Sequence, residues 1–176
     1  MLCKARHYVN IDILTNLYYC LIYPYLIYGI VTWGHTYEST TNSLFILQKK
    51  ALRLITFSTF SAHTNSIFHS LKIIKFPDLV FLHTALLMHD YYSNNLPTSF
   101  KSYFNEIKQK HNYNTRLASR LTYSLPKIRT NYGKFNIKFS GVKIWNEISD
   151  SCKKLNKSKF KESICENFLN SYATQS

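Results

Sequence analysis

Basic side chains are the residues of this chain whose types and spacing could do chemistry, and the chemistry they support is the binding of phosphate. On a helical wheel, Lys49, Lys50 and Arg53 fall within one arc of about 100°. A second basic stretch contains no Asp or Glu between Ile107 and Asn146, although it holds nine bases: Lys108, Lys110, Arg116, Arg120, Lys127, Arg129, Lys134, Lys138 and Lys143. Because like charges repel, such a stretch is typical of a segment that lies beside a polyanion.

The whole chain shares this imbalance, since 22 Lys and Arg accompany nine Asp and Glu, which gives a net charge of +13 and a pI near 9.6. Nucleic acid is the expected partner, and an anionic membrane face is the alternative. The stripe at residues 49–53 can also be an ordinary solvated helix face, and Arg116 can instead pair with an acid. The predicted nucleic-acid contacts are Lys49, Lys50, Arg53, Arg116, Arg120, Lys127 and Arg129.

Catalytic chemistry has no comparable set of residues. The nine acids are scattered, whereas two-metal phosphoryl transfer needs clustered carboxylates. His63 and His69 are six residues apart, as are His83 and His89, and six helical residues rotate by about 240°, so neither pair shares a face. Gly-rich phosphate loops and HExxH or CxxC motifs are missing from the sequence. We therefore expect no catalytic residue, metal, cofactor or small-molecule substrate.

The elements that must position the bases are mostly helices. A first helix is expected from about Asp12 to Val31, bent or split at Pro24. A second, capped by Thr40 or Thr41, should run through about Ile55. Its apolar arc predicts that the following residues are buried opposite the basic stripe: Leu44, Leu47, Ala51, Leu54 and Ile55.

The rest of the chain is expected to alternate between helices and a polar loop. A short helix at residues 65–71 precedes a long, apolar one that opens at Pro77 and Asp78 and ends near Tyr92. Residues 98–106 can add a turn or two, and residues 107–134 are predicted to be an extended loop or linker. Alternation over residues 135–139 predicts a short strand, and residues 142–148 a helical turn that buries Trp145. A last helix is expected over residues 158–172.

These elements predict a mainly α fold with three parts: a helical domain at residues 1–97, a basic linker at 98–134 and a small C-terminal strand and helix segment at 135–176. Hydrophobic residues make up 45% of the chain, which is enough for a core, and Gly and Pro number only four each. Trp145 is expected in that core, with base stacking as the alternative, and Tyr113 is left open between stacking and a solvated position.

One segment, residues 13–37, carries no charge and is long enough to span a bilayer. Five tyrosines and Pro24 crowd its middle, and tyrosine belongs at membrane interfaces, so we expect a protein core and keep a membrane anchor as the alternative. The four cysteines form no close pair in sequence, which favours free thiols and an intracellular setting in the cytoplasm or nucleus.

Four blocks of sequence occur in one order: LYYCLIYPYLIYGIVTWG at 17–34, LQKKALRLITF at 47–57, HNYNTR at 111–116 and FNIKFSGVKIWN at 135–146. Together they resemble the C-terminal region of the reverse transcriptases of jockey-like non-LTR retrotransposons. The resemblance implies that residues 12–95 form a helical thumb, which in that family grips the template-primer duplex. It implies that residues 107–176 match the C-terminal extension. The family's catalytic Tyr-x-Asp-Asp hairpin is missing, so we expect a non-catalytic fragment of an RNA-directed DNA polymerase that retains nucleic-acid binding.

Overall fold

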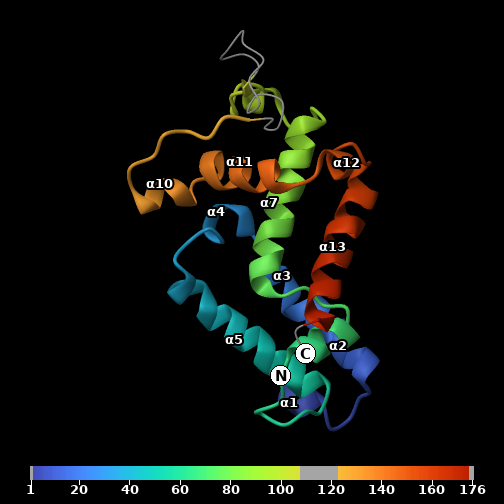
Figure 1. Cartoon of the computed structure of the whole chain (residues 1–176). Helices are drawn as coiled ribbons and strands as arrows, with labels where there is room; N and C mark the ends of the chain where they lie inside the picture. The colour runs from blue at the N-terminus through green and yellow to red at the C-terminus, as the bar shows by residue number, and fades with distance from the viewer. Residues whose placement is uncertain (1, 108–122, 175–176) are drawn as a thin grey trace. The chain divides into compact units, whose positions relative to one another are not determined.

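The computed structural model describes residues 2–107 and 123–174, and over these residues it is mainly α-helical, as predicted (Figure 1). Its elements are α1 (Leu2–Ala5), α2 (Ile11–Leu21), α3 (Tyr23–Ile27), α4 (Ile30–Trp33), α5 (Glu38–Ile55), α6 (Asn65–Ser70), α7 (Phe76–Tyr92), the 3₁₀ turn η1 (Thr98–Phe100), α10 (Asn131–Phe135), α11 (Ile137–Glu147), α12 (Asp150–Lys153) and α13 (Lys157–Ala173). The described residues contain no strand, and an isolated antiparallel bridge joins Glu106 to Tyr123.

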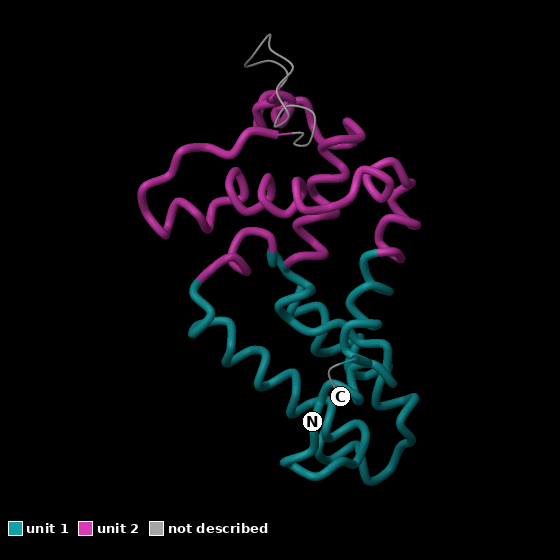
Figure 2. The backbone as a smooth tube through the Cα atoms, in the orientation of Figure 1, with its two compact units in different colours: residues 1–30, 37–80, 164–176 teal, residues 31–36, 81–163 magenta. Residues whose placement is uncertain are grey.

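The chain divides into two compact units, which Figure 2 colours separately. Unit 1 comprises Met1–Ile30, Tyr37–Val80 and Ile164–Ser176, and unit 2 comprises Val31–Thr36 and Phe81–Ser163. This division does not follow the expected boundaries at residues 97 and 134. The reason is visible in unit 1, where Tyr172 near the C-terminus donates a hydrogen bond to the Asp78 carboxylate and packs its ring 6.2 Å from Phe68.

Unit 1 begins with the apolar segment that was expected to form one bent or split helix. The structure splits it into α2 and α3 in unit 1 and α4, most of which belongs to unit 2, with Pro24 in the first turn of α3, where proline is tolerated. Gly29 separates α3 from α4 with a φ of 59°, a conformation that is cheap only for glycine. The core of unit 1 is built from buried side chains of these and the later helices: Leu14, Tyr18, Leu26, Ile30, Leu52, Ile55, Phe68, Ile73, Phe76, Leu79 and Tyr172.

Helix α5 carries the basic stripe, and its start and buried face both differ from the prediction. It begins at Glu38 with Tyr37 at the N-cap, so the expected cap by Thr40 or Thr41 is wrong. The buried residues are Gln48, Ala51, Leu52 and Ile55. This arc is rotated by about 60° from the predicted one at 100° per residue.

The rotation exposes leucines that were expected to be buried. Leu47 is 58% exposed, and Leu44 and Leu54 are half-buried. The three line an open, mostly apolar pocket of about 630 Å³ within unit 1. Only Ala51 and Ile55 of the predicted apolar arc are buried.

Gln48 explains the rotation, because its buried amide bonds to three parts of unit 1. The Nε2 group donates to the Tyr18 hydroxyl at 2.9 Å and to the Ile74 carbonyl at 3.0 Å. The Oε1 atom accepts from the backbone N–H of Phe76, the first residue of α7, at 2.8 Å. First-turn N–H groups have no partner within their own helix, so this bond caps α7 from another helix.

Unit 2 is organised around α11 and residues 81–92 of α7, whose first five residues belong to unit 1. Helix α7 is buried on nearly all sides, as its composition predicted. Trp145 of α11 is fully buried, which confirms the expected core position, and its ring lies 6.0 Å from Phe160 and 5.4 Å from Tyr92. Gly141 permits a close approach, because a Cβ at this position would lie 3.0 Å from the Met88 sulfur.

Two predictions about the C-terminal third are wrong. Residues 135–139 do not form a strand, since Phe135 ends α10 and residues 137–139 belong to α11. The Asn136 side chain accepts a hydrogen bond from the Lys138 N–H at 2.9 Å and caps α11, a local interaction that favours helix over the short alternation. The expected loop also does not extend to Lys134, because α10 begins at Asn131 behind a Thr130 cap.

Candidate nucleic-acid interface

Helix α5 places the three predicted bases of unit 1 on the side away from the Gln48 face. Lys50 is exposed, and Lys49 and Arg53 are half-buried. The Lys49 ammonium lies 4.0 Å from the centre of the Phe45 ring, one helical turn earlier. The prediction of an exposed basic face is therefore confirmed for Lys50 and holds only in part for Lys49 and Arg53.

Arg53 is held in place by the loop that follows α5. Its Nε group donates to the Ala62 carbonyl at 3.0 Å, and its guanidinium carbon lies 5.9 Å from the centre of the Phe60 ring. The Lys50 ammonium lies 6.0 Å from the same ring. A guanidinium has five N–H donors, so the terminal nitrogens of Arg53 can still bind an oxyanion.

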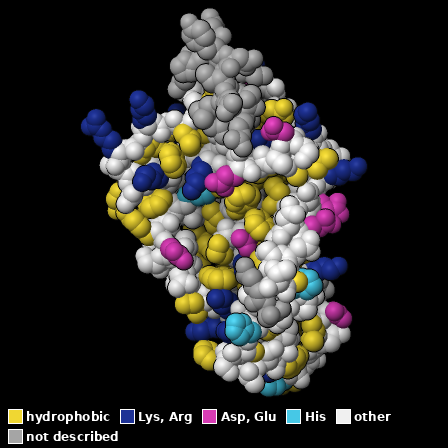
Figure 3. Space-filling model, viewed as in Figure 1, with side chains coloured by type: hydrophobic (Ala, Val, Ile, Leu, Met, Phe, Trp, Pro, Cys, Tyr) yellow, Lys and Arg dark blue, Asp and Glu magenta, His cyan; other side chains and the backbone are white. Residues whose placement is uncertain are grey.

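A polar pocket of about 350 Å³ opens beside these bases. Its lining residues come from α5 and from the segment that leads into α6: Lys49, Arg53, Ser61, Ala62, His63, Thr64 and Asn65. Cationic side chains at the wall of a polar pocket are suited to phosphate oxygens, which accept charge-assisted hydrogen bonds. Figure 3 shows basic side chains next to hydrophobic ones on the face of the molecule in view.

Lys75 adds a cation that the sequence prediction missed. Its ammonium lies 3.9 Å from the centre of the Tyr172 ring. Burial lowers the pKa of Lys75, and the nearby positive charge of Lys49 lowers it further, while the Asp78 carboxylate opposes both. Lys75 follows no helical period because it precedes α7, so no sequence pattern pointed to it.

The bases of α5 lack acidic partners in the part of the chain that the structure describes. The ion pairs there are Lys153–Asp150 at 3.0 Å and Lys157–Asp90 at 2.7 Å, both within unit 2. We define the basic surface of unit 1 as Lys49, Lys50, Arg53 and Lys75. Lys75 lies near the Asp78 carboxylate, whereas Lys49, Lys50 and Arg53 have no acidic partner among the described residues, and phosphate binding would relieve the repulsion between these three charges.

The remaining predicted contacts lie in or beside the acid-free stretch. Lys127 and Arg129 are exposed and belong to unit 2, in the extended segment before α10. Arg116 and Arg120 lie outside the described residues, as does Tyr113. The structure thus groups Lys49, Lys50 and Arg53 as one surface and places two of the other four predicted contacts in unit 2.

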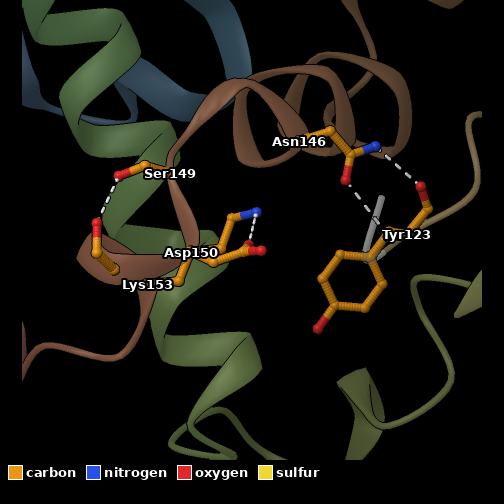
Figure 4. A network of polar contacts seen from close by, with 6 residues as sticks. Tyr123, Asn146, Ser149, Asp150 and Lys153 are labelled. Carbon is orange, nitrogen blue, oxygen red and sulfur yellow. Dashed lines mark hydrogen bonds and ion pairs between the residues drawn. The ribbon is translucent and has the colours of Figure 1, made fainter. Parts of the chain in front are cut away.

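A backbone clamp joins residues 105–106, residues 123–124 and Asn146, and the sequence did not predict it. The Asn146 side chain donates to the Tyr123 carbonyl at 2.9 Å and accepts from the Tyr123 N–H at 3.4 Å (Figure 4). The Ser124 N–H donates to the Asn105 carbonyl at 2.9 Å, beside the Glu106–Tyr123 bridge. The last residue of the FNIKFSGVKIWN block therefore has a structural role.

Aromatic rings bury the clamp. The Tyr91 ring lies 4.7 Å from Phe104 and 5.7 Å from Tyr123, and its hydroxyl donates to the Lys101 carbonyl at 3.1 Å. Burial raises the pKa of Tyr123, and the neighbouring Tyr91 and Glu106 side chains raise it further. Residues 104–107 and 123–124 are thus held together by backbone hydrogen bonds and ring packing.

Histidines, cysteines and apolar helices are the features of the described residues that bear on metal, thiol and membrane chemistry. No group of three or more His, Cys, Asp and Glu side chains that could hold a metal ion occurs within residues 2–107 and 123–174. His89 is buried, with Nε2 at 2.9 Å from the Leu155 carbonyl and its ring against Phe160. None of the described cysteines, Cys3, Cys20, Cys152 and Cys165, forms a disulfide bond. None of the described helices is long and apolar enough to cross a membrane, and residues 13–37 are divided among α2, α3 and α4.

Comparisons with known proteins identify no relative of the chain. No family model, curated protein or solved structure matches it.

Proposed function

We propose that this chain is the thumb-like C-terminal region of a non-LTR retrotransposon reverse transcriptase, without the polymerase carboxylates, and that it binds the backbone of a nucleic acid. The basic surface of unit 1 carries the proposal, because cations around a polar pocket lack carboxylate partners in the described chain. The family in this proposal rests on the resemblance of the four sequence blocks, and the helical fold is compatible with a thumb.

The chemistry of the surface favours backbone contacts over base recognition. Ammonium and guanidinium groups neutralise phosphates whatever the sequence, and each neutralised phosphate releases a counterion. The rings of Phe45 and Phe60 already lie under Lys49, Lys50 and Arg53. We expect binding to RNA or DNA in the micromolar range at low salt, with little sequence preference and a steep dependence on salt.

A salt titration of duplex binding tests this function. Changing Lys49, Lys50 and Arg53 together to Gln should flatten the slope of log K against log salt by about two, at roughly 0.9 per phosphate contact. The matched control changes three exposed lysines of unit 2 outside the acid-free stretch, Lys154, Lys159 and Lys161, to Gln and so removes the same charge. Fluorescence anisotropy measures binding, and circular dichroism checks that both variants remain folded.

Equal slopes for the two triple variants would show that net charge alone drives binding and would remove unit 1 as the site. A wild-type chain that binds nothing at low salt would overturn the proposal altogether. The family assignment has its own test, which is the coding sequence upstream of Met1. An in-frame Tyr-x-Asp-Asp hairpin there would support it, and an unrelated sequence would count against it.

The proposal includes the absence of polymerase activity in this chain. Two-metal nucleotidyl transfer needs a carboxylate cluster, and neither the acid spacing in the sequence nor the described residues contain one. We expect no incorporation of nucleotides on a primed template with magnesium or manganese. Template-dependent incorporation above a blank without protein would contradict this.

A further inference from the structure

A second polar pocket lies in unit 2, next to the backbone clamp. It has a volume of about 150 Å³. Its lining residues come from residues 102–105, residues 124–126 and helix α11: Ser102, Tyr103, Phe104, Asn105, Ser124, Pro126, Lys138 and Val142. Small-molecule sites usually measure about 300–1,000 Å³, so this pocket is too small for a nucleoside. It has room for a single oxyanion and a few waters, each of which fills roughly 30 Å³.

The polar wall of this pocket combines the Lys138 cation with hydroxyl and amide groups. Lys138 is exposed, and its ammonium is held 4.4 Å from the centre of the Tyr103 ring. The Ser124 hydroxyl oxygen is buried and has no hydrogen-bond partner. Buried hydroxyls normally have a partner, and this unpaired one next to a cation is free to donate to an anion.

The backbone around Ser124 is fixed independently of any ligand. Its N–H donates to the Asn105 carbonyl, and the preceding residue, Tyr123, is bound on its other edge by Asn146. Ser102 and Asn105 complete the rim with a hydroxyl and an amide. A preformed wall lowers the entropic cost of binding a small anion.

We propose that this pocket binds one phosphate group, either free or as part of a nucleic-acid strand, through Lys138 and Ser124. Phosphate is favoured over a carboxylate because it offers three or more acceptor oxygens to donors on several sides of the pocket. No carboxylate side chain lines the pocket to repel it. The site is separate from the basic surface of unit 1, so each proposal can fail without the other.

Phosphate titration followed by amide NMR tests the site in the full chain, with chloride adjusted to hold ionic strength constant. We expect saturable shifts at residues 102–105, 124 and 138. Lys138→Gln should weaken the apparent affinity about five-fold, because a charge-assisted contact is lost, and Ser124→Ala should also weaken it. The control Lys143→Gln lies on the same helix, is exposed, and removes the same charge without lining the pocket.

Two further arms identify the source of the phosphate and separate the two proposals. A short single-stranded oligonucleotide that saturates the same resonances at lower concentration than inorganic phosphate identifies a strand phosphate, and the reverse order identifies a free one. The Lys49, Lys50 and Arg53 triple variant should leave the phosphate shifts unchanged. Equal affinities for Lys138→Gln and Lys143→Gln, or shifts that map elsewhere, would overturn the site.

Discussion

Replacing Gln48 with Met should destabilise unit 1, because the buried amide is the polar centre of that unit. Gln48 is 1% exposed and forms three hydrogen bonds, to Tyr18, to the Ile74 carbonyl and from the Phe76 N–H. Methionine keeps the length and flexibility of the side chain but provides no comparable donor or acceptor. The change therefore removes the hydrogen bonds with little change in packing volume.

The magnitude follows from the number of bonds. A typical hydrogen bond contributes about 1 kcal/mol net, and leaving its buried partner unsatisfied raises the loss to about 1–3 kcal/mol. Three such bonds, partly offset by the better burial of methionine, predict a loss of about 3 kcal/mol in the free energy of unfolding. For a chain of this size that corresponds to a decrease of about 6–12 °C in Tm.

Urea unfolding followed by circular dichroism measures the loss, and Leu47→Ala serves as the neighbouring control. Leu47 is 58% exposed, so its truncation should change the free energy of unfolding by about 0.5 kcal/mol. Had α5 adopted the predicted register, Leu47 would be buried and its truncation would cost about 2–5 kcal/mol. The pair of variants therefore reports directly on which face of α5 is buried.

Tyr18→Phe supplies the second side of a double-mutant cycle. It removes the hydroxyl that accepts from Gln48, and the two changes should be coupled by about 1 kcal/mol. A Gln48→Met variant as stable as the wild type would refute the argument, as would a loss above about 2 kcal/mol in Leu47→Ala.

Two further predictions concern the clamp and the Asp78 carboxyl. Asn146→Ala should lower the free energy of unfolding by about 1–2 kcal/mol and speed hydrogen exchange at the Tyr123 and Ser124 amides. The control Asn131→Ala, at an exposed site, should do neither. Unchanged amide exchange in Asn146→Ala would contradict the clamp. Burial raises the pKa of Asp78, against opposing effects of the Tyr172 hydrogen bond and Lys75, so the folded chain binds this proton more tightly than the unfolded chain. Stability due to Asp78 should therefore fall as pH rises from about 4 through the raised pKa, and urea unfolding at several pH values should show Asp78→Asn gaining on the wild type as pH rises. A difference in the free energy of unfolding between Asp78→Asn and the wild type that stays constant with pH would contradict the effect of burial on Asp78.

Sequence periodicity predicted the helices whose packing depends mainly on hydrophobicity. Helices α7 and α13 fall within two residues of the expected ranges, because α7 is apolar nearly all round and α13 repeats Phe160, Ile164 and Phe168 at a spacing of four. The short strand at residues 135–139 was wrong because five alternating residues fit either structure. Capping by Asn136 decides between them, and a hydrophobic pattern does not contain that information.

The residue types of the candidate site could be predicted from the sequence, but the hydrogen bonds that hold its elements in place could not. Helical angles grouped Lys49, Lys50 and Arg53 correctly, since all three lie on one helix. The register of that helix was missed because polarity places Gln48 outside, whereas its partners lie 26–30 residues away in the chain. The Asn146 clamp was missed for the same reason, since its partner Tyr123 is 23 residues distant.

Two hydrogen bonds hold α5 and one of its cationic side chains in fixed positions, which affects the entropic cost of binding phosphate. Gln48 fixes one face of the helix, and the Ala62 carbonyl fixes the Arg53 guanidinium on another. Side chains that are already ordered lose less entropy on binding, at about 0.5–1.5 kcal/mol for each flexible side chain spared. An exposed lysine such as Lys50 retains that cost in full. Within the basic surface of unit 1, Arg53 should therefore contribute more to phosphate affinity than Lys50, even though Lys50 is the more exposed of the two.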